Sequence, residues 1–321
     1  MNIGRSNGIK VAMALLAIAG LGSSRVVSQE KPASAVVMAK LLVTAEVDKD
    51  KKAPEIKLSD VAVKVGKERV PVKHWEAATG QYGGLALFIL IDDVLDPSTG
   101  GLFGDIRDFI KAQPATTLIG VGYMRNAGVT VAQDLTNDHE AAAKAVRLPT
   151  GSSGSANPYL SLNSLIKKWP DHGGRKEVLM ITDGIDRLRP RSSRMDLMAP
   201  SSDVSTASTA AQKAGVLVYS FYATSVGHMV RTNSAAASGG QSGLAKLSEE
   251  TGGDSYFMGY SNPVSFKPYL EDLQKCLDNQ YWLAIDIMPG SKPSLKRVDV
   301  STEVPGVELI TADSIFVPAA K

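Results

Sequence analysis

The apolar positions of residues 80–279 switch repeatedly between short continuous runs and helical spacing. Leu85–Ile91 is an unbroken apolar run, and a second run lies within Glu177–Thr182. Such runs are too short for a helix and are typical of strands that are covered on both faces of a parallel sheet. Between them, apolar residues recur at helical spacing, as at Ile106 and Ile110. This alternation predicts an α/β fold with a doubly wound, largely parallel sheet.

The two ends of the chain show a different pattern, typical of half-buried antiparallel strands. In residues 29–79, Val61, Val63 and Val65 alternate with other residues, and a β-like pattern returns in residues 280–321. Each segment is too small to be stable by itself. We therefore expect residues 280–321 to pair with residues 36–78 in a small β domain that flanks the α/β body of residues 80–279.

The first 28 residues have the layout of a secretory signal peptide. Arg5 and Lys10 precede the apolar run Val11–Leu21, and the small residues suited to cleavage end at Ser28. The run is too short for an ordinary membrane span. We therefore expect a secreted or periplasmic protein without membrane insertion after signal removal, with a retained N-terminal anchor as the alternative.

The charge balance excludes a general attraction to nucleic acid or to acidic membranes. The chain has 35 Lys and Arg residues against 33 Asp and Glu residues. Removal of residues 1–28 takes away three basic residues and no acid, which leaves a chain close to neutral. A neutral chain lacks the basic surface that nucleic-acid binding requires.

The single cysteine, Cys276, cannot form an internal disulfide.

Carboxylates follow both buried runs of the predicted central sheet. Asp92, Asp93 and Asp96 come directly after the first run, and Asp183 follows the second. In an open α/β sheet, ligands bind at the carboxyl ends of the strands. The sequence therefore predicts a concentration of negative charge at the edge where ligands are expected.

A strand that ends in Asp92-Asp93, a Gly/Ser loop, and a strand that ends in Thr182-Asp183-Gly184 resemble the layout of the von Willebrand factor A domain. The resemblance covers roughly residues 84–279. The flanking β segments, with Asn279-Gln280-Tyr281 at the start of the second, resemble the bacterial secreted group of von Willebrand A-related proteins. The resemblance implies a Rossmann-like fold and a metal-ion-dependent adhesion site.

In that family the ion is held by an Asp-x-Ser-x-Ser motif, a threonine on a second loop and an aspartate on a third. Asp92 and Asp183 match the two aspartates, whereas Val94 and Asp96 stand at the serine positions. The second-loop ligand stays open among several residues: Thr150, Ser152, Ser153, Ser155 and Asn157. The resemblance thus implies a degenerate site for Mg²⁺ or Ca²⁺, with Asp92, Asp96, Asp183 and Ser155 as ligands. The alternative is that Asp92 and Asp183 accept backbone N–H groups of adjacent loops.

The loops after the predicted strands should all emerge at one edge of the sheet. They are residues 92–104, 149–157, 183–203 and 224–242. The last loop is rich in Ser, Ala and Gly, which favours flexibility. The third contains four arginines, followed by Met195 and Met198: Arg187, Arg189, Arg191 and Arg194. Arginine together with methionine favours a protein interface, here facing an acidic partner, with a mobile charged loop as the alternative.

The chain contains no Gly-x-Ser-x-Gly elbow, no P-loop and no His-Glu-x-x-His motif. We therefore expect a non-enzymatic protein-binding or adhesion module. One alternative is a metal-dependent hydrolase or phosphatase that uses Asp92, Asp96 and Asp183. Another is a structural component of the cell envelope that assembles through the small β domain.

Overall fold

The structure is a computed structural model that describes residues 36–47, 54–151, 156–170, 173–189, 193–225, 234–257 and 259–320. Residues 34–321 group into one compact unit. The predicted signal peptide, residues 1–28, lies outside the described residues. None of the helices in the described part is long and apolar enough to cross a bilayer.

The central sheet of the described residues is largely parallel, and its strand order is β10-β9-β8-β5-β6-β7. Its strands are β5 (Leu85–Asp92), β6 (Thr117–Arg125), β7 (Gly128–Thr136), β8 (Arg175–Thr182), β9 (Val216–Tyr222) and β10 (Ser255–Tyr256). Only the edge strand β7 runs antiparallel to its neighbour within this sheet. Every residue of β5 is buried. The arrangement confirms the predicted α/β fold class.

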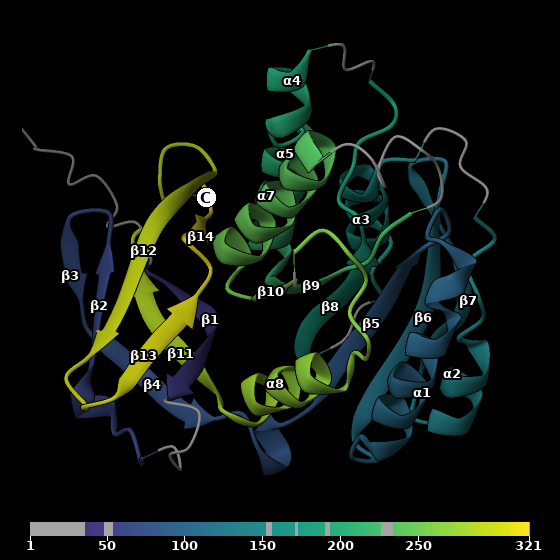
Figure 1. Cartoon of the computed structure of the whole chain (residues 1–321). Coiled ribbons are helices and arrows are strands. Elements are labelled where there is room, and N and C mark those ends of the chain that lie inside the picture. Colours follow the sequence, from purple (N-terminus) through teal and green to yellow (C-terminus); the bar gives the residue numbers. More distant parts are fainter. Residues whose placement is uncertain are drawn as a thin grey trace, which may run out of the picture. The chain divides into compact units, whose positions relative to one another are not determined.

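Helices cover both faces of this sheet (Figure 1). They are α1 (Phe103–Ala112), α2 (His139–Ala145), α3 (Pro158–Lys167), α5 (Asp203–Ala214), α7 (Ser234–Thr251) and α8 (Lys267–Asp278). Because successive side chains of a strand point to opposite faces, Leu87 and Ile89 share one core with α1, α2 and α8. Phe88 and Leu90 share the other core with α3, α5 and α7. Short helical turns also occur at η1 (Leu58–Asp60), η2 (Gly80–Tyr82), η3 (Pro97–Leu102) and α4 (Arg194–Met198).

Three of the predicted loops contain helix, and the segment 92–104 is one of them because it includes η3. The segment 183–203 includes α4, and α7 begins at Ser234, inside the segment 224–242 that the sequence favours as flexible. The small residues there serve close packing. A Cβ on Gly239 would lie 2.0 Å from the carbonyl oxygen of Leu197, and one on Gly240 would lie 2.1 Å from that of Asp183. Glycine at these positions therefore lets α7 lie directly against α4 and the end of β8.

The two ends of the chain form a β-sandwich. Strands β1 (Val37–Val47), β2 (Val61–Val65), β3 (Glu68–Val70) and β4 (Val72–Ala77) come before the α/β body, and β11 (Gln280–Ile287), β12 (Ser294–Thr302), β13 (Val307–Thr311) and β14 (Ser314–Val317) come after it. Among the described residues they pair as β13-β1-β11-β4 and β14-β12-β2-β3. The register places Leu41 opposite Leu283 and Val63 opposite Val300. The two sheets share one apolar core.

A buried polar group, which we call the junction cluster, joins the sandwich to the α/β body: Arg175, Glu177 and Gln280. The Arg175 guanidinium donates to the carbonyl oxygen of Leu277 (2.7 Å), to Gln280 Oε1 (2.6 Å) and to the carbonyl oxygen of Gly83 (3.0 Å). The Gln280 amide donates to Glu177 Oε2 (3.2 Å). Arg175 Nη1 lies 4.0 Å from Glu177 Oε1. The Arg175 guanidinium is therefore held mainly by these three acceptors and not by the Glu177 carboxylate.

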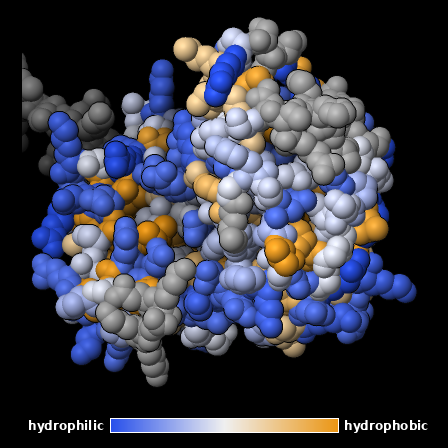
Figure 2. All heavy atoms as spheres, in the orientation of Figure 1, coloured by the Kyte–Doolittle hydropathy of each residue, from blue (hydrophilic) through white to orange (hydrophobic). Residues whose placement is uncertain are grey.

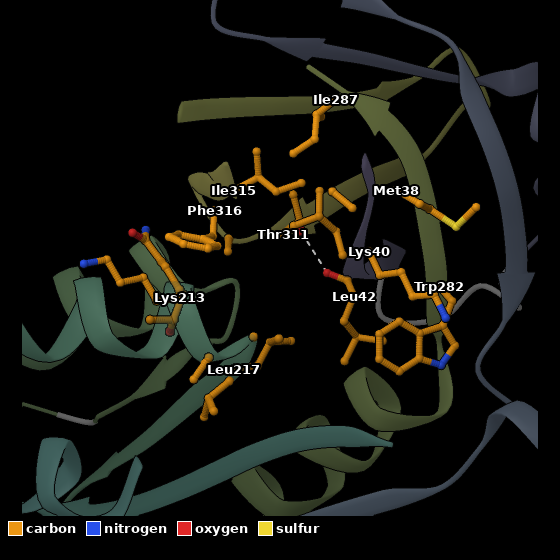
Figure 3. A pocket seen from close by; sticks show the side chains of 18 of the residues that line it. Met38, Lys40, Leu42, Lys213, Leu217, Trp282, Ile287, Thr311, Ile315 and Phe316 are labelled. Carbon is orange, nitrogen blue, oxygen red and sulfur yellow. Dashed lines mark hydrogen bonds between the residues drawn. The ribbon is translucent and has the colours of Figure 1, made fainter. Parts of the chain in front are cut away.

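A mostly apolar cavity of about 340 Å³ lies where β1 and β14 face α5 (Figure 3). Leu42, Leu217 and Ile315 line it, and Lys40 and Lys213 contribute its charged groups. The Thr311 hydroxyl donates to the carbonyl oxygen of Leu42 at its wall (2.8 Å). We interpret this mostly apolar cavity as a gap in the packing between the sandwich and α5.

Candidate functional site

The carboxyl ends of β5 and β8 lie side by side because these strands are parallel neighbours in the sheet. Their register pairs Ile91 with Ile181, so Asp92 and Asp183 follow at the same edge. Both aspartates are fully buried. The structure therefore brings together the two carboxylates that the sequence places at strand ends.

The Asp92 carboxylate is surrounded by donors from its own strand end and from β8. The Thr182 hydroxyl donates to Asp92 Oδ2 (2.7 Å), and the amide of Val94 donates to Oδ1 (3.3 Å). The Gly184 amide in turn donates to the Thr182 hydroxyl (3.1 Å). Burial, together with the charge of Asp183, raises the pKa of Asp92 from 3.8 to about 7.

The Asp183 carboxylate is paired with Arg187. The Arg187 guanidinium donates to both carboxylate oxygens, with Nη1 3.0 Å from Oδ1, and it also donates to the Ser225 hydroxyl (2.6 Å). The amide of Ile185 donates to Asp183 Oδ1 (3.0 Å). Burial opposes the charged guanidinium, but the charge and hydrogen bonds of Asp183 raise the pKa of Arg187 above its ordinary value. This is a two-point, charge-assisted pair inside the protein.

Two further carboxylates at this edge, those of Asp96 and Asp93, also accept hydrogen bonds from within the chain. Asp96 accepts the amide of Ser98 (2.9 Å) and caps η3. Asp93 is buried, pairs with Arg147 (2.8 Å) and accepts the amide of Thr150 (3.0 Å). Although burial opposes it, hydrogen bonding to Arg147 and Thr150 lowers the pKa of Asp93.

This arrangement does not fit the cation site that the resemblance implies. Val94 is buried and has no ligand oxygen on its side chain, and Asp96 is directed to η3. Asp92 and Asp183 accept backbone amides two residues ahead, as in the alternative that the sequence leaves open. Ser155 lies outside the described residues. Within the described ranges, no group of three or more His, Cys, Asp or Glu side chains is placed to hold a metal ion.

The arginines predicted to face a partner have different positions. Arg187 is directed inward to Asp183, with a side chain only 17% exposed. Arg189 donates to the hydroxyl of Ser202 and pairs with Asp203 (2.9 Å). Arg194, the first residue of α4, is exposed, and Arg191 lies outside the described residues. Two of the predicted partner contacts are therefore ion pairs within the chain.

Three exposed apolar side chains accompany the exposed Arg194 in this segment, and we call these four residues the α4 patch: Leu188, Arg194, Met195 and Met198. Met195 is 82% exposed, Met198 48% and Leu188 39%. Figure 2 shows apolar atoms at the surface around α4. The sequence predicts the arginine–methionine association, but not that Met195 would be far more exposed than Met198 and Leu188.

The α4 patch is held in place by hydrogen bonds on both sides. The Ser193 hydroxyl accepts the amide of Asp196 (3.0 Å), and the Asp196 carboxylate accepts the amide of Ser193 (3.3 Å), which closes a capping box. Before the helix, Asp186 accepts the amide of Leu188 and the hydroxyl of Ser201, both at 2.9 Å. The exposed side chains therefore project from a fixed backbone.

No protein-family model matches the chain, and a search of curated proteins finds no match. Solved structures with a similar fold include a von Willebrand factor type A protein from Catenulispora acidiphila, at 11% identity and a TM-score of 0.45, over 91% of this chain and 76% of that one. An aerotolerance-related membrane protein from Bacteroides fragilis has 10% identity and a TM-score of 0.42, over 61% and 99%. The ArnB paralog VWA2 from Sulfolobus acidocaldarius has 11% identity and a TM-score of 0.36, over 81% and 76%.

Proposed function

We propose that this chain, whose central sheet is doubly wound and largely parallel, is a protein-binding module of the von Willebrand factor A type that acts through the α4 patch. The observation that carries the proposal is the exposure of Leu188, Met195 and Met198 on a backbone fixed by capping hydrogen bonds. Exposed methionine next to arginine is typical of the centre of protein interfaces. The order already present in the free surface lowers the entropy that binding would cost.

The partner surface that fits the α4 patch is apolar, with an acidic group opposite Arg194. Arg194 is exposed at the start of α4, next to Met195. With the leader of residues 1–28 removed, we expect the protein to meet this partner in a secreted or periplasmic location. The contact is thus a protein–protein interface in which apolar burial provides most of the affinity.

Catalysis by Asp92 and Asp183 finds less support. A hydrolytic carboxylate must reach its substrate or hold a metal ion that does so. Both carboxylates are fully buried, and their oxygens accept hydrogen bonds from Thr182, Val94, Ile185 and Arg187. We therefore propose a binding role without turnover.

The test compares affinity capture by three forms of the mature chain. In Met195→Ser/Met198→Ser the α4 patch loses its two methionines, and the matched control Met38→Ser/Met288→Ser changes two methionines of the sandwich that are 51% and 57% exposed. We expect the wild type and the control to recover the same partner and the α4 variant to lose it. Equal recovery by all three would refute the proposal.

The non-enzymatic part of the proposal has a separate test. Purified wild-type protein is assayed with phosphatase and esterase substrates, beside Asp92→Asn. We expect no turnover by either form. Turnover by the wild type that disappears in Asp92→Asn would assign the edge to catalysis.

A further inference from the structure

The Arg187 guanidinium lies against the carboxylate that follows β8, at the sheet edge where β5 also ends. It contacts both oxygens of Asp183, and its charge also acts on Asp92. We propose that Arg187 is a built-in cation that takes the place of a divalent metal ion at this edge. The sheet edge would then keep one fixed arrangement whether or not metal ions are present.

The donor set argues for an internal cation because the carboxylate oxygens are already used. A divalent ion such as Mg²⁺ or Ca²⁺ needs several oxygen ligands directed at one point. Asp183 directs both oxygens to the guanidinium, and Oδ1 also accepts the amide of Ile185. An entering ion would have to displace a buried positive charge from its partner, which is unfavourable.

Arg187 cannot diffuse away, because it belongs to the loop that follows β8. Its amide donates to the carbonyl oxygen of Ala156 (2.8 Å), and its Nη1 donates to the carbonyl oxygen of Ile185 (3.1 Å). These bonds fix the backbone and the side chain from two directions. A tethered cation of this kind competes with any free ion at a high effective concentration.

The same guanidinium connects two strand ends directly, and a backbone bridge links the second of them to a third. Besides Asp183 after β8, it donates to Ser225 after β9 (2.6 Å), and Ser225 forms a β-bridge with Leu95 after β5. The amide of Asp96 donates to the carbonyl oxygen of Thr224 beside this bridge (3.1 Å). Arg187 is therefore placed to hold together the loops that a shared metal ion could otherwise join.

The experiment titrates MgCl₂, MnCl₂ and CaCl₂ separately into the full mature chain by calorimetry, with thermal unfolding in EDTA or metal as a second readout. The variants are Arg187→Ser and Arg187→Gln, which remove the cation, and Arg187→Lys, which keeps a positive charge. Arg189→Gln is the matched control, because Arg189 pairs with Asp203 instead.

We expect no saturable binding and no change in Tm for the wild type, Arg187→Lys and Arg189→Gln. Arg187→Ser and Arg187→Gln should bind one ion per chain, with a Tm that rises with metal concentration. Saturable metal binding by the wild type that is lost in Asp183→Asn would overturn the proposal. This comparison decides the question even if neither Arg187→Ser nor Arg187→Gln folds. A folded neutral variant that binds no metal would overturn it equally. These outcomes are independent of partner capture by the α4 patch, so the two proposals can fail separately.

Discussion

Glu177 of the junction cluster offers a direct test of how burial controls this fold. The side chain is fully buried, and burial raises its pKa from 4.5 to about 7. Arg175 counteracts this only in part, because its guanidinium bonds to Leu277, Gln280 and Gly83 and stays 4.0 Å from the carboxylate. The perturbation is Glu177→Gln, which keeps the shape and an acceptor for the Gln280 amide but cannot ionise.

The sign of the effect follows from which state keeps the proton. Below pH 4.5 the carboxyl is protonated in both the folded and the unfolded chain. Between pH 4.5 and about 7 the folded chain keeps the proton that the unfolded chain loses, so rising pH favours unfolding. Above that range both states are ionised and the contribution is constant. At about 1.4 kcal/mol per pKa unit, the carboxyl lowers the free energy of unfolding by about 3 kcal/mol across this window.

The assay is urea unfolding of the wild type and Glu177→Gln at intervals from pH 4.5 to pH 8. We expect similar free energies of unfolding at the acidic end and a variant that is more stable by about 3 kcal/mol at pH 8. Glu140→Gln, at an exposed glutamate of α2, should follow the wild type within about 0.5 kcal/mol at every pH. A difference that does not change with pH, or a wild type that gains stability relative to Glu177→Gln as pH rises, would refute the reasoning.

Two other stability predictions concern the sheet edge. Arg187→Ala leaves the Asp183 carboxylate buried without its counter-charge, so we expect the free energy of unfolding to fall by about 3–5 kcal/mol. Arg189→Ala, at a half-exposed guanidinium, should cost at most about 1 kcal/mol. Equal losses in urea titration would contradict this distinction. Gly240→Ala puts a Cβ 2.1 Å from the carbonyl oxygen of Asp183, so we expect a loss of about 1–3 kcal/mol. Gly101→Ala, which meets no atom within 4 Å, should change little. A Gly240→Ala protein with the Tm of the wild type would show that α7 does not pack as closely as described.

The fold class could be predicted from the sequence because it depends on local pattern. Leu85–Ile91 cannot be solvated on either face, and strand β5 is buried along its whole length. The helix α7 was harder to predict. Its Ser, Ala and Gly residues favour flexibility when they are considered singly. Glycine is required at positions 239 and 240 because Leu197 and Asp183 approach them closely, and they do so only in the folded chain.

The candidate site shows the same division between local and distant information. The position of Asp92 and Asp183 at adjacent strand ends follows from the two apolar runs. The direction of the arginines does not, because Arg187 and Arg189 look equivalent in a basic loop, yet one pairs with Asp183 and the other with Asp203. A four-residue spacing brings two side chains together on a helix, but residues 183–187 are not helical, so the first pair has no local signal in the sequence.

The main chain enters and leaves the α/β body at neighbouring points, since the amide of Ala78 donates to the carbonyl oxygen of Gln280 (2.7 Å). In architectural terms the body is an insertion into a continuous sandwich, and its two attachment points are adjacent. The loops that follow β5 and β8 lie at the opposite end of β5, about 25 Å away at the usual rise per strand residue. The strand pairing of the sandwich is therefore set far from those loops, and we expect substitutions in them to leave that pairing unchanged.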